Sequence, residues 1–149
     1  MAVAIAALIG PAACGGDDPQ PLVGPPPRSD PASLNGTWTG KKPGYTLRYV
    51  FRPDGTYRYS SLMRQERERG TATFRITARG TFAARQRTLV VRPRSGTKER
   101  RDPDDPDGDY TRRLERFPQR YGWTIRGTGK DARLTLTIGG GLAVTYRRG

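Results

Sequence analysis

Hydrophobic and polar residues alternate with a period of two through most of the chain from residue 34 onward. In residues 45–52, one face is apolar and aromatic: Tyr45, Leu47, Tyr49 and Phe51. Such alternation is typical of strands that bury one face. Related patterns recur in residues 57–63, 71–84, 88–92, 114–117, 121–125, 134–138 and 142–146. No segment keeps a helical period, so the chain is predicted to be all-β.

Turn residues separate these segments. Residues 53–55 (Pro-Asp-Gly) have the composition of a tight turn and predict a hairpin between the strands beside them. Gly80 interrupts a long alternating stretch and predicts a bulge or sharp bend. Pro93 is expected to end its strand, so that residues 94–109 form a polar loop. About eight strands at hairpin spacing fit either a sandwich or a small antiparallel up-and-down barrel. The barrel is the favoured prediction, because closure removes both sheet edges.

The first 32 residues lack this pattern. Residues 1–13 are apolar, uncharged and too short to span a bilayer, which matches the hydrophobic core of a signal peptide. Cys14 follows two alanines, and this arrangement resembles a bacterial lipobox, whose cysteine becomes lipidated. Residues 14–32 are rich in Pro and Gly and predict a lipidated cysteine on a disordered tether. Residues 33–149 then form one domain.

The lipobox resemblance implies a lipoprotein in the bacterial cell envelope, membrane-anchored on the extracytoplasmic side. Two acyl chains on Cys14 would make such an anchor durable. The alternative is an ordinary secretory signal that contains a cysteine without being lipidated. Under either interpretation the signal peptide implies export.

The chain has no histidine, and Cys14 is its only cysteine. These absences exclude Ser-His-Asp and Cys-His catalysis, an intramolecular disulfide and the usual His/Cys zinc sites. We therefore predict a protein that is not an enzyme, with no catalytic residues, no metal site and no cofactor. Residues 102–109 contain five of the 14 acidic residues. Oxygen ligands at such density suit Ca²⁺, but their spacing does not fit an EF-hand. This favours a solvated loop whose carboxylates pair with the neighbouring arginines Arg100, Arg101, Arg112 and Arg113.

The formal net charge is +13, from 27 basic and 14 acidic side chains. Such a balance attracts anionic surfaces. The arginines are scattered along the chain, however, which also fits a solvated surface. Nucleic-acid binding would need aromatic residues interleaved with this charge, and export argues against it. We predict contact with anionic lipid headgroups beneath the anchor, and no nucleic-acid partner.

Three motifs carry a resemblance to a known family. Residues 34–38 (Leu-x-Gly-Thr-Trp) open the domain, residues 51–57 contain Phe-x-Pro-Asp-Gly-Thr-Tyr, and Tyr146-Arg147-Arg148 closes it. Together they resemble the small bacterial lipocalin-like domains, which have calycin-type barrels. The resemblance implies that Arg147 or Arg148 lies over Trp38 at the closed end of the barrel. A guanidinium over an indole contributes about 0.5–2 kcal/mol and would fasten the first strand to the last.

Alternation also predicts which rings face the barrel interior. The expected lumen residues are Tyr45, Tyr49, Phe51, Tyr57, Tyr59, Phe74, Trp123 and Tyr146, with Phe82 also inward. Small barrels either fill their interior with side chains or hold one small ligand. The first alternative makes the domain a protein–protein interaction or inhibitor module that recognises another envelope protein. The second makes it a binding protein for a small apolar or amphipathic molecule.

Overall fold

The structure, a computed structural model, describes residues 30–139 and 141–149. The predicted signal peptide, Cys14 and most of the predicted tether lie outside the described residues. The fold is all-β, as the alternation predicts. Its strands are β1 (Gly36–Lys42), β2 (Tyr45–Phe51), β3 (Thr56–Arg67), β4 (Gly70–Arg85), β5 (Thr88–Arg101), β6 (Tyr110–Arg113), β7 (Gln119–Arg126), β8 (Arg133–Thr137) and β9 (Ala143–Arg148).

Three short 3-10 helices accompany the strands: η1 (Pro31–Leu34), η2 (Pro106–Gly108) and η3 (Gly129–Asp131). In the described part of the chain, no helix has the length and apolar character needed to cross a membrane. Asp30 caps η1 by accepting a hydrogen bond from the Ala32 amide at 3.1 Å. This cap fixes the point at which the chain enters the barrel.

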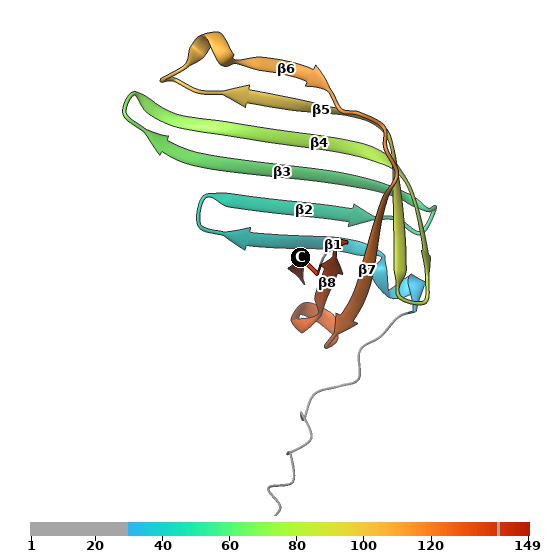
Figure 1. Cartoon of the computed structure of the whole chain (residues 1–149). Coiled ribbons are helices and arrows are strands. Elements are labelled where there is room, and N and C mark those ends of the chain that lie inside the picture. The colour runs from blue at the N-terminus through green and yellow to red at the C-terminus, as the bar shows by residue number, and fades with distance from the viewer. Residues whose placement is uncertain (1–29, 140) are drawn as a thin grey trace, which may run out of the picture.

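Eight antiparallel strands close into a barrel, which confirms the predicted up-and-down fold (Figure 1). The order runs β1 to β5, then β7, β8 and β9, and β9 returns to β1. Trp38 pairs with Arg148 and Thr39 with Arg147 at this closing seam. The ninth strand, β6, lies outside the closed ring and pairs with β5 alone. Closure leaves most strand edges paired, which satisfies backbone groups that an open sheet would expose.

The long strands β4 and β5 bend together, and Gly80 marks the bend as predicted. The register shifts between Arg79 and Gly80, where β5 contributes an extra residue, Arg94. A Cβ at position 80 would lie 2.0 Å from the Arg92 carbonyl oxygen, so only glycine fits without a backbone shift. The predicted strand end at Pro93 is wrong, because β5 continues to Arg101. Pro93 lies opposite Gly80 at the bulge, where a missing N–H does not interrupt a regular ladder.

The predicted strand at residues 114–117 is also wrong. The strand in this region is β6, which ends at Arg113, and residues 114–118 form an irregular connection to β7. Strands β6 and β7 pair with different parts of the same edge of β5, so the connection must follow that edge. The Leu114 amide donates to the Gly96 carbonyl at 3.0 Å, which holds the connection against β5.

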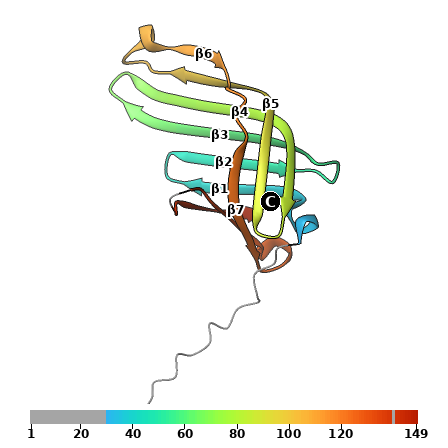
Figure 2. The ribbon, with the colours of Figure 1, turned by 45° about the vertical axis from the view of Figure 1, so that its right-hand side comes forward.

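The two layers of the barrel cross steeply, and the hydrophobic core lies between them. Figure 2 shows β5 and β7 running across β1, β2 and β3. The largest fully buried side chains include Trp38, Trp123, Phe51 and Leu34. In Figure 1, the outer parts of β3, β4 and β5 extend beyond the barrel together with β6. The barrel therefore has one end closed by η1 and another beneath this extension.

Candidate ligand-binding cavity

The closed end is built around Trp38, which is fully buried. Its indole Nε1 donates to the Leu34 carbonyl at 2.7 Å, and the Arg148 guanidinium lies 4.5 Å from the centre of its ring. The same guanidinium donates to the carbonyls of Ser33 at 2.7 Å and Asn35 at 3.1 Å. Arg148 therefore connects the last strand, the first strand and η1.

Arg147 does not take part in this arrangement. It is exposed, because neighbouring residues of a strand point to opposite faces and Arg148 points inward. Of the two arginines that the family resemblance implied, the structure places Arg148 over the indole. The pairing of Trp38 with Arg148 across β1 and β9 sets this choice.

A cavity of about 540 Å³ lies at the opposite end of the barrel. Its volume falls within the range of about 300–1,000 Å³ that is usual for small-molecule sites. Six of the seven tyrosines of the chain line it: Tyr45, Tyr49, Tyr57, Tyr59, Tyr121 and Tyr146. Aliphatic side chains, among them Leu47, Ile76 and Leu136, complete the wall. The barrel is thus packed at the Trp38 end and hollow at the tyrosine end.

The predicted lumen residues divide between these two regions. Five of them line the cavity: Tyr45, Tyr49, Tyr57, Tyr59 and Tyr146. Phe51 and Trp123 belong to the packed core, and Phe74 is partly buried on β4 outside the cavity lining. Phe82 packs edge-on against Phe51, with ring centres 4.9 Å apart. The cavity tyrosine that sequence reasoning missed is Tyr121, although it alternates with inward Trp123 and Ile125.

Tyr49 lies at the centre of the aromatic cluster. Its ring centre lies 4.6 Å from that of Tyr59, 5.2 Å from that of Phe51 and 5.7 Å from that of Tyr146. Tilted, stacked and edge-on pairs at such distances stabilise beyond the area they bury. These contacts hold the rings of the cavity wall in place without a ligand, so the wall is largely preformed.

Five of the cavity tyrosines have raised pKa values, so their hydroxyls are neutral over the physiological pH range. Burial, with smaller effects from neighbouring tyrosines, raises the pKa of Tyr49 well above its ordinary value. Burial raises the pKa of Tyr57 and of Tyr59 to about 12, and it also raises the pKa values of Tyr121 and Tyr146. The hydroxyls therefore offer neutral donors and acceptors on an otherwise apolar wall.

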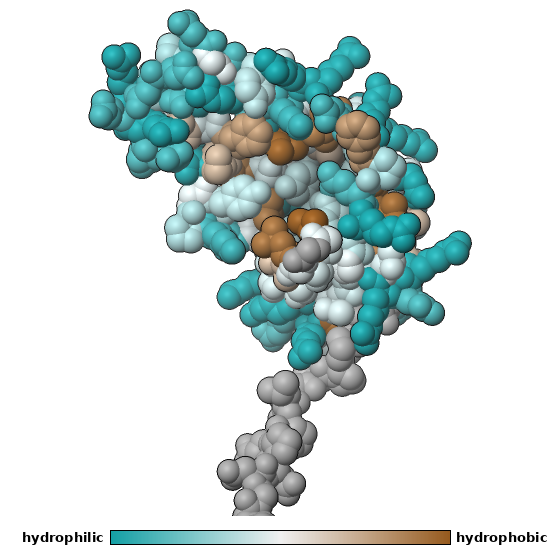
Figure 3. Space-filling view, viewed as in Figure 1, coloured by the Kyte–Doolittle hydropathy of each residue, from teal (hydrophilic) through white to brown (hydrophobic). Residues whose placement is uncertain are grey.

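Apolar side chains surround the mouth of this cavity. Phe117, Leu142 and Ile138 line it and are 68%, 65% and 41% exposed, respectively. Figure 3 shows hydrophobic residues gathered in a hollow between the extended strands and the lower part of the barrel. Lys42, Lys98 and Glu115 supply charge to the same lining. Contiguous exposed apolar surface of this kind commonly marks a binding site.

One buried polar group in the core has no partner. The indole Nε1 of Trp123 is buried, and within residues 30–139 and 141–149 it makes no hydrogen bond. Trp123 follows Tyr121 along β7, two residues closer to the closed end. An orphaned donor costs about 1–3 kcal/mol, so it marks a weak point below the cavity.

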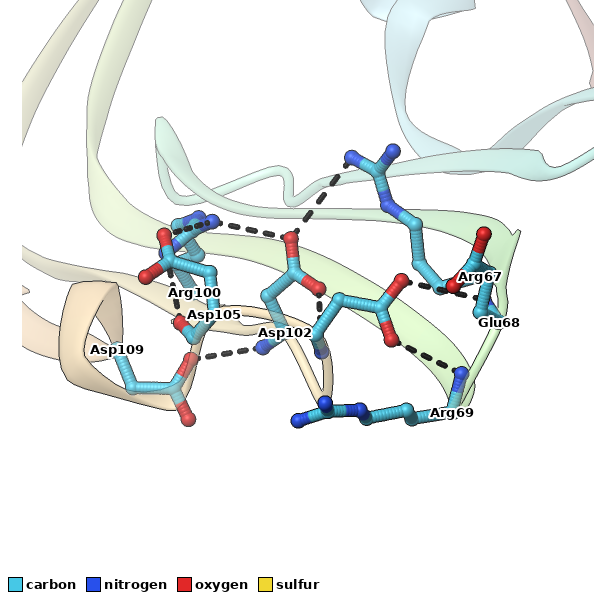
Figure 4. A network of polar contacts seen from close by, with 8 residues as sticks. Arg67, Glu68, Arg69, Arg100, Asp102, Asp105 and Asp109 are labelled. Atoms are coloured by element: carbon cyan, nitrogen blue, oxygen red, sulfur yellow. Dashed lines mark hydrogen bonds and ion pairs between the residues drawn. The ribbon is translucent and has the colours of Figure 1, made fainter.

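The acidic loop after β5 ties two turns together (Figure 4). Asp102 is buried and pairs with Arg100 at 3.0 Å and with Arg67 at 3.7 Å. Asp104 accepts hydrogen bonds from the amides of Glu68 and Arg69, in the turn between β3 and β4.

Two further acidic side chains of this loop, Asp105 and Asp109, also contact protein groups. Asp105 pairs with Arg100 at 2.9 Å, and Asp109 accepts from the Asp102 amide at 2.7 Å. Of the arginines expected to pair with the loop, Arg101 instead pairs with Glu99, and Arg112 lies over the Tyr110 ring. No group of three or more potential metal ligands occurs in the described part of the chain. These contacts give the loop a structural role, because they hold it against the turn between β3 and β4.

The closed eight-stranded antiparallel barrel is consistent with a calycin-like barrel. Here the Trp38–Arg148 contact lies at the sealed end and the tyrosines lie at the open end. Comparison of the chain with protein-family models, with curated proteins and with solved structures finds no match.

Proposed function

We propose that this domain is a lipocalin-like binding protein that holds a small amphipathic molecule in its tyrosine-lined cavity. The observation that carries the proposal is the convergence of six of the seven tyrosines on one cavity of about 540 Å³. An apolar body would pack against the rings, and its polar groups would bond the neutral hydroxyls. Lys42 and Lys98 favour a ligand with an acidic group near the mouth.

We further propose that the protein is a cell-envelope lipoprotein anchored through Cys14. The described chain begins at Asp30, next to η1 and the closed end, whereas Leu142 and Ile138 lie at the mouth. An anchor before Asp30 would thus join the barrel at the end away from the cavity. Mass spectrometry of protein from its native host should find acyl chains on Cys14, and unmodified soluble protein would contradict the anchor.

A second function has a specific observation in its favour. The exposed side chains of Phe117 and Leu142 form an apolar rim that could be covered by another envelope protein. The cavity beneath this rim makes a small ligand the better proposal, because a filled barrel would leave no such space. If a variant with a blocked cavity no longer binds the ligand but still captures an envelope protein, that result would favour the protein–protein module.

The ligand proposal is tested with an anionic aromatic probe, anilinonaphthalene sulfonate, and the full chain. Val144 lines the cavity, so Val144→Trp should fill it and abolish probe binding without changing the unfolding midpoint. Tyr59→Phe should weaken binding about 2- to 12-fold, which corresponds to one hydrogen bond of about 0.5–1.5 kcal/mol.

The matched control is Tyr110→Phe, because Tyr110 is the one tyrosine outside the cavity lining. It should leave probe affinity unchanged. Equal binding by wild type and a folded Val144→Trp variant would refute the cavity as the site. Equal effects of Tyr59→Phe and Tyr110→Phe would refute the role of the hydroxyls.

A further inference from the structure

Arginines gather on the outer face of the barrel, on the side of the strands opposite the tyrosines. Strands β2, β3 and β4 alternate, so the residues between the inward rings point outward. Two adjoining hollows of about 920 and 560 Å³ lie on this face and share Arg48, Ser60 and Thr77. We call them together the arginine groove. Its arginines are Arg48, Arg52, Arg58, Arg64, Arg75, Arg79, Arg94, Arg113 and Arg116.

Strand register brings two of these positive charges directly together. Arg58 lies opposite Arg79 in the β3–β4 pair, and like charges in that relation destabilise a sheet. The Arg79 Nε donates to the Ser95 hydroxyl at 2.7 Å, which orients its guanidinium within the groove. The terminal nitrogens of both side chains remain able to donate. An anion bound between the two guanidinium groups would be attracted to both and would offset their mutual repulsion.

Acidic side chains are scarce around the groove within the described part of the chain. Its lining contains no Asp or Glu, and none of its arginines forms an ion pair there. The acidic side chains on neighbouring outer positions have other partners. Glu99 lies opposite Arg75 of the groove in the β4–β5 pair, but its ion pair is with Arg101, at 3.2 Å. Glu66 accepts from the Thr71 hydroxyl at 3.2 Å. The electrostatic potential of the groove is therefore positive along its length.

We propose that the arginine groove binds an extended polyanion that carries phosphate groups and no bases. Outward residues along a strand recur every second position, about 6.6–6.8 Å apart. The arginines of one strand are therefore spaced at regular intervals along the groove. Arginine forks bind phosphate through two parallel hydrogen bonds. The Ser60 hydroxyl on the floor of the groove can donate to the same oxygens.

Two other anionic partners fit the groove less well. Single-stranded nucleic acid is usually held by aromatic platforms as well as charge. Tyr59 and Tyr45 are also among the lining residues of the groove, but both rings belong to the inward face of the sheet. Tyr59 packs on Tyr49 and Tyr45 lines the cavity, so neither provides such a platform. A bilayer surface is broad, whereas these arginines line hollows in the face of the sheet. A narrow chain can enter such a hollow.

The proposal is tested by titrating the full chain with inorganic polyphosphate at several salt concentrations. The double variant Arg58→Gln/Arg79→Gln should lose at least tenfold in affinity. Its slope of log K against log salt should fall by about 1.4, since each lost phosphate contact removes about 0.7. The control Arg87→Gln/Arg126→Gln has the same net charge, 13 − 2 = +11, and lies outside the groove. It should lose less than twofold.

Equal losses in the two variants would overturn the proposal, because binding would then depend on total charge. The unfolding midpoint shows whether each variant is folded, and Arg48→Gln provides a second groove variant if the double variant is not. A thymidine oligomer of equal charge and vesicles with anionic phospholipid serve as competitors. Tighter binding of either one than of polyphosphate, dependent on Arg58 and Arg79, would assign the groove to that partner and also overturn the proposal.

Discussion

Replacing Arg148 by alanine tests the seal of the barrel most directly. The change removes the cation–π contact with Trp38 and the hydrogen bonds to the carbonyls of Ser33 and Asn35. The first contributes about 0.5–2 kcal/mol. Hydrogen bonds from a charged donor contribute about 1.5–3 kcal/mol each when shielded, but Arg148, Ser33 and Asn35 are all only partly buried. We therefore expect the free energy of unfolding to fall by about 2–3 kcal/mol.

The measurement is urea unfolding followed by tryptophan fluorescence, with thermal unfolding as a second observable. A loss of this size corresponds to a midpoint about 6–12 °C lower for a domain of this length. Arg148→Lys keeps the charge and loses the planar fork, so it should fall between wild type and Arg148→Ala.

Arg147→Ala is the matched control, since it removes the same side chain from the neighbouring, outward position. We expect a change within about 0.5 kcal/mol, as for other exposed residues without specific contacts. Equal effects of the two alanine variants would show that the seal depends on general charge or strand propensity. A neutral Arg148→Ala would show that the seal contributes nothing to stability.

Two further predictions concern the bend and the cavity. Gly80→Ala should destabilise the domain by more than about 2 kcal/mol in chemical unfolding, because its Cβ would lie 2.0 Å from a backbone oxygen. The control Gly139→Ala, with open space around it, should be neutral. If both variants were neutral, the requirement for glycine at the bend would be contradicted. Tyr57 and Tyr59 keep their protons more tightly when folded, with pKa values raised from 10.0 to about 12. The stability from these two groups is therefore full below pH 10 and is lost as the pH rises from 10 to 12. Phenolate absorbance and unfolding midpoints across this window measure it, and titration of all tyrosines near pH 10 in the folded protein would refute it.

Much of the barrel could be predicted because its determinants are local. Alternation assigns each residue of a strand to one of two faces, and turn residues such as Pro53 to Gly55 separate the strands. The inward faces of β2, β3, β7 and β9 follow from this rule alone. Closure into a barrel was favoured over a sandwich because it leaves no unpaired sheet edge.

Local rules failed where one strand pairs with two different strands along the same edge. Strand β5 pairs with β6 along one part of its edge and with β7 along another, and the bulge beside Pro93 redirects it between the two. Proline in a sequence window predicts a strand end, since it cannot donate to a ladder. Only the fold shows that position 93 faces a bulge, where that donor is not required.

The chain by itself therefore indicated the strand faces, favoured the closed barrel and identified most of the rings that point inward, Tyr121 excepted. Tertiary structure decided how deep each inward ring lies: Phe51 and Trp123 fill the sealed end, whereas Tyr121 joins the other tyrosines around the cavity. It also selected Arg148 rather than Arg147 as the cover of Trp38. The physical reason is that depth and partner depend on the register between strands distant in sequence. A period of two specifies the face of a residue and leaves its position along the barrel open.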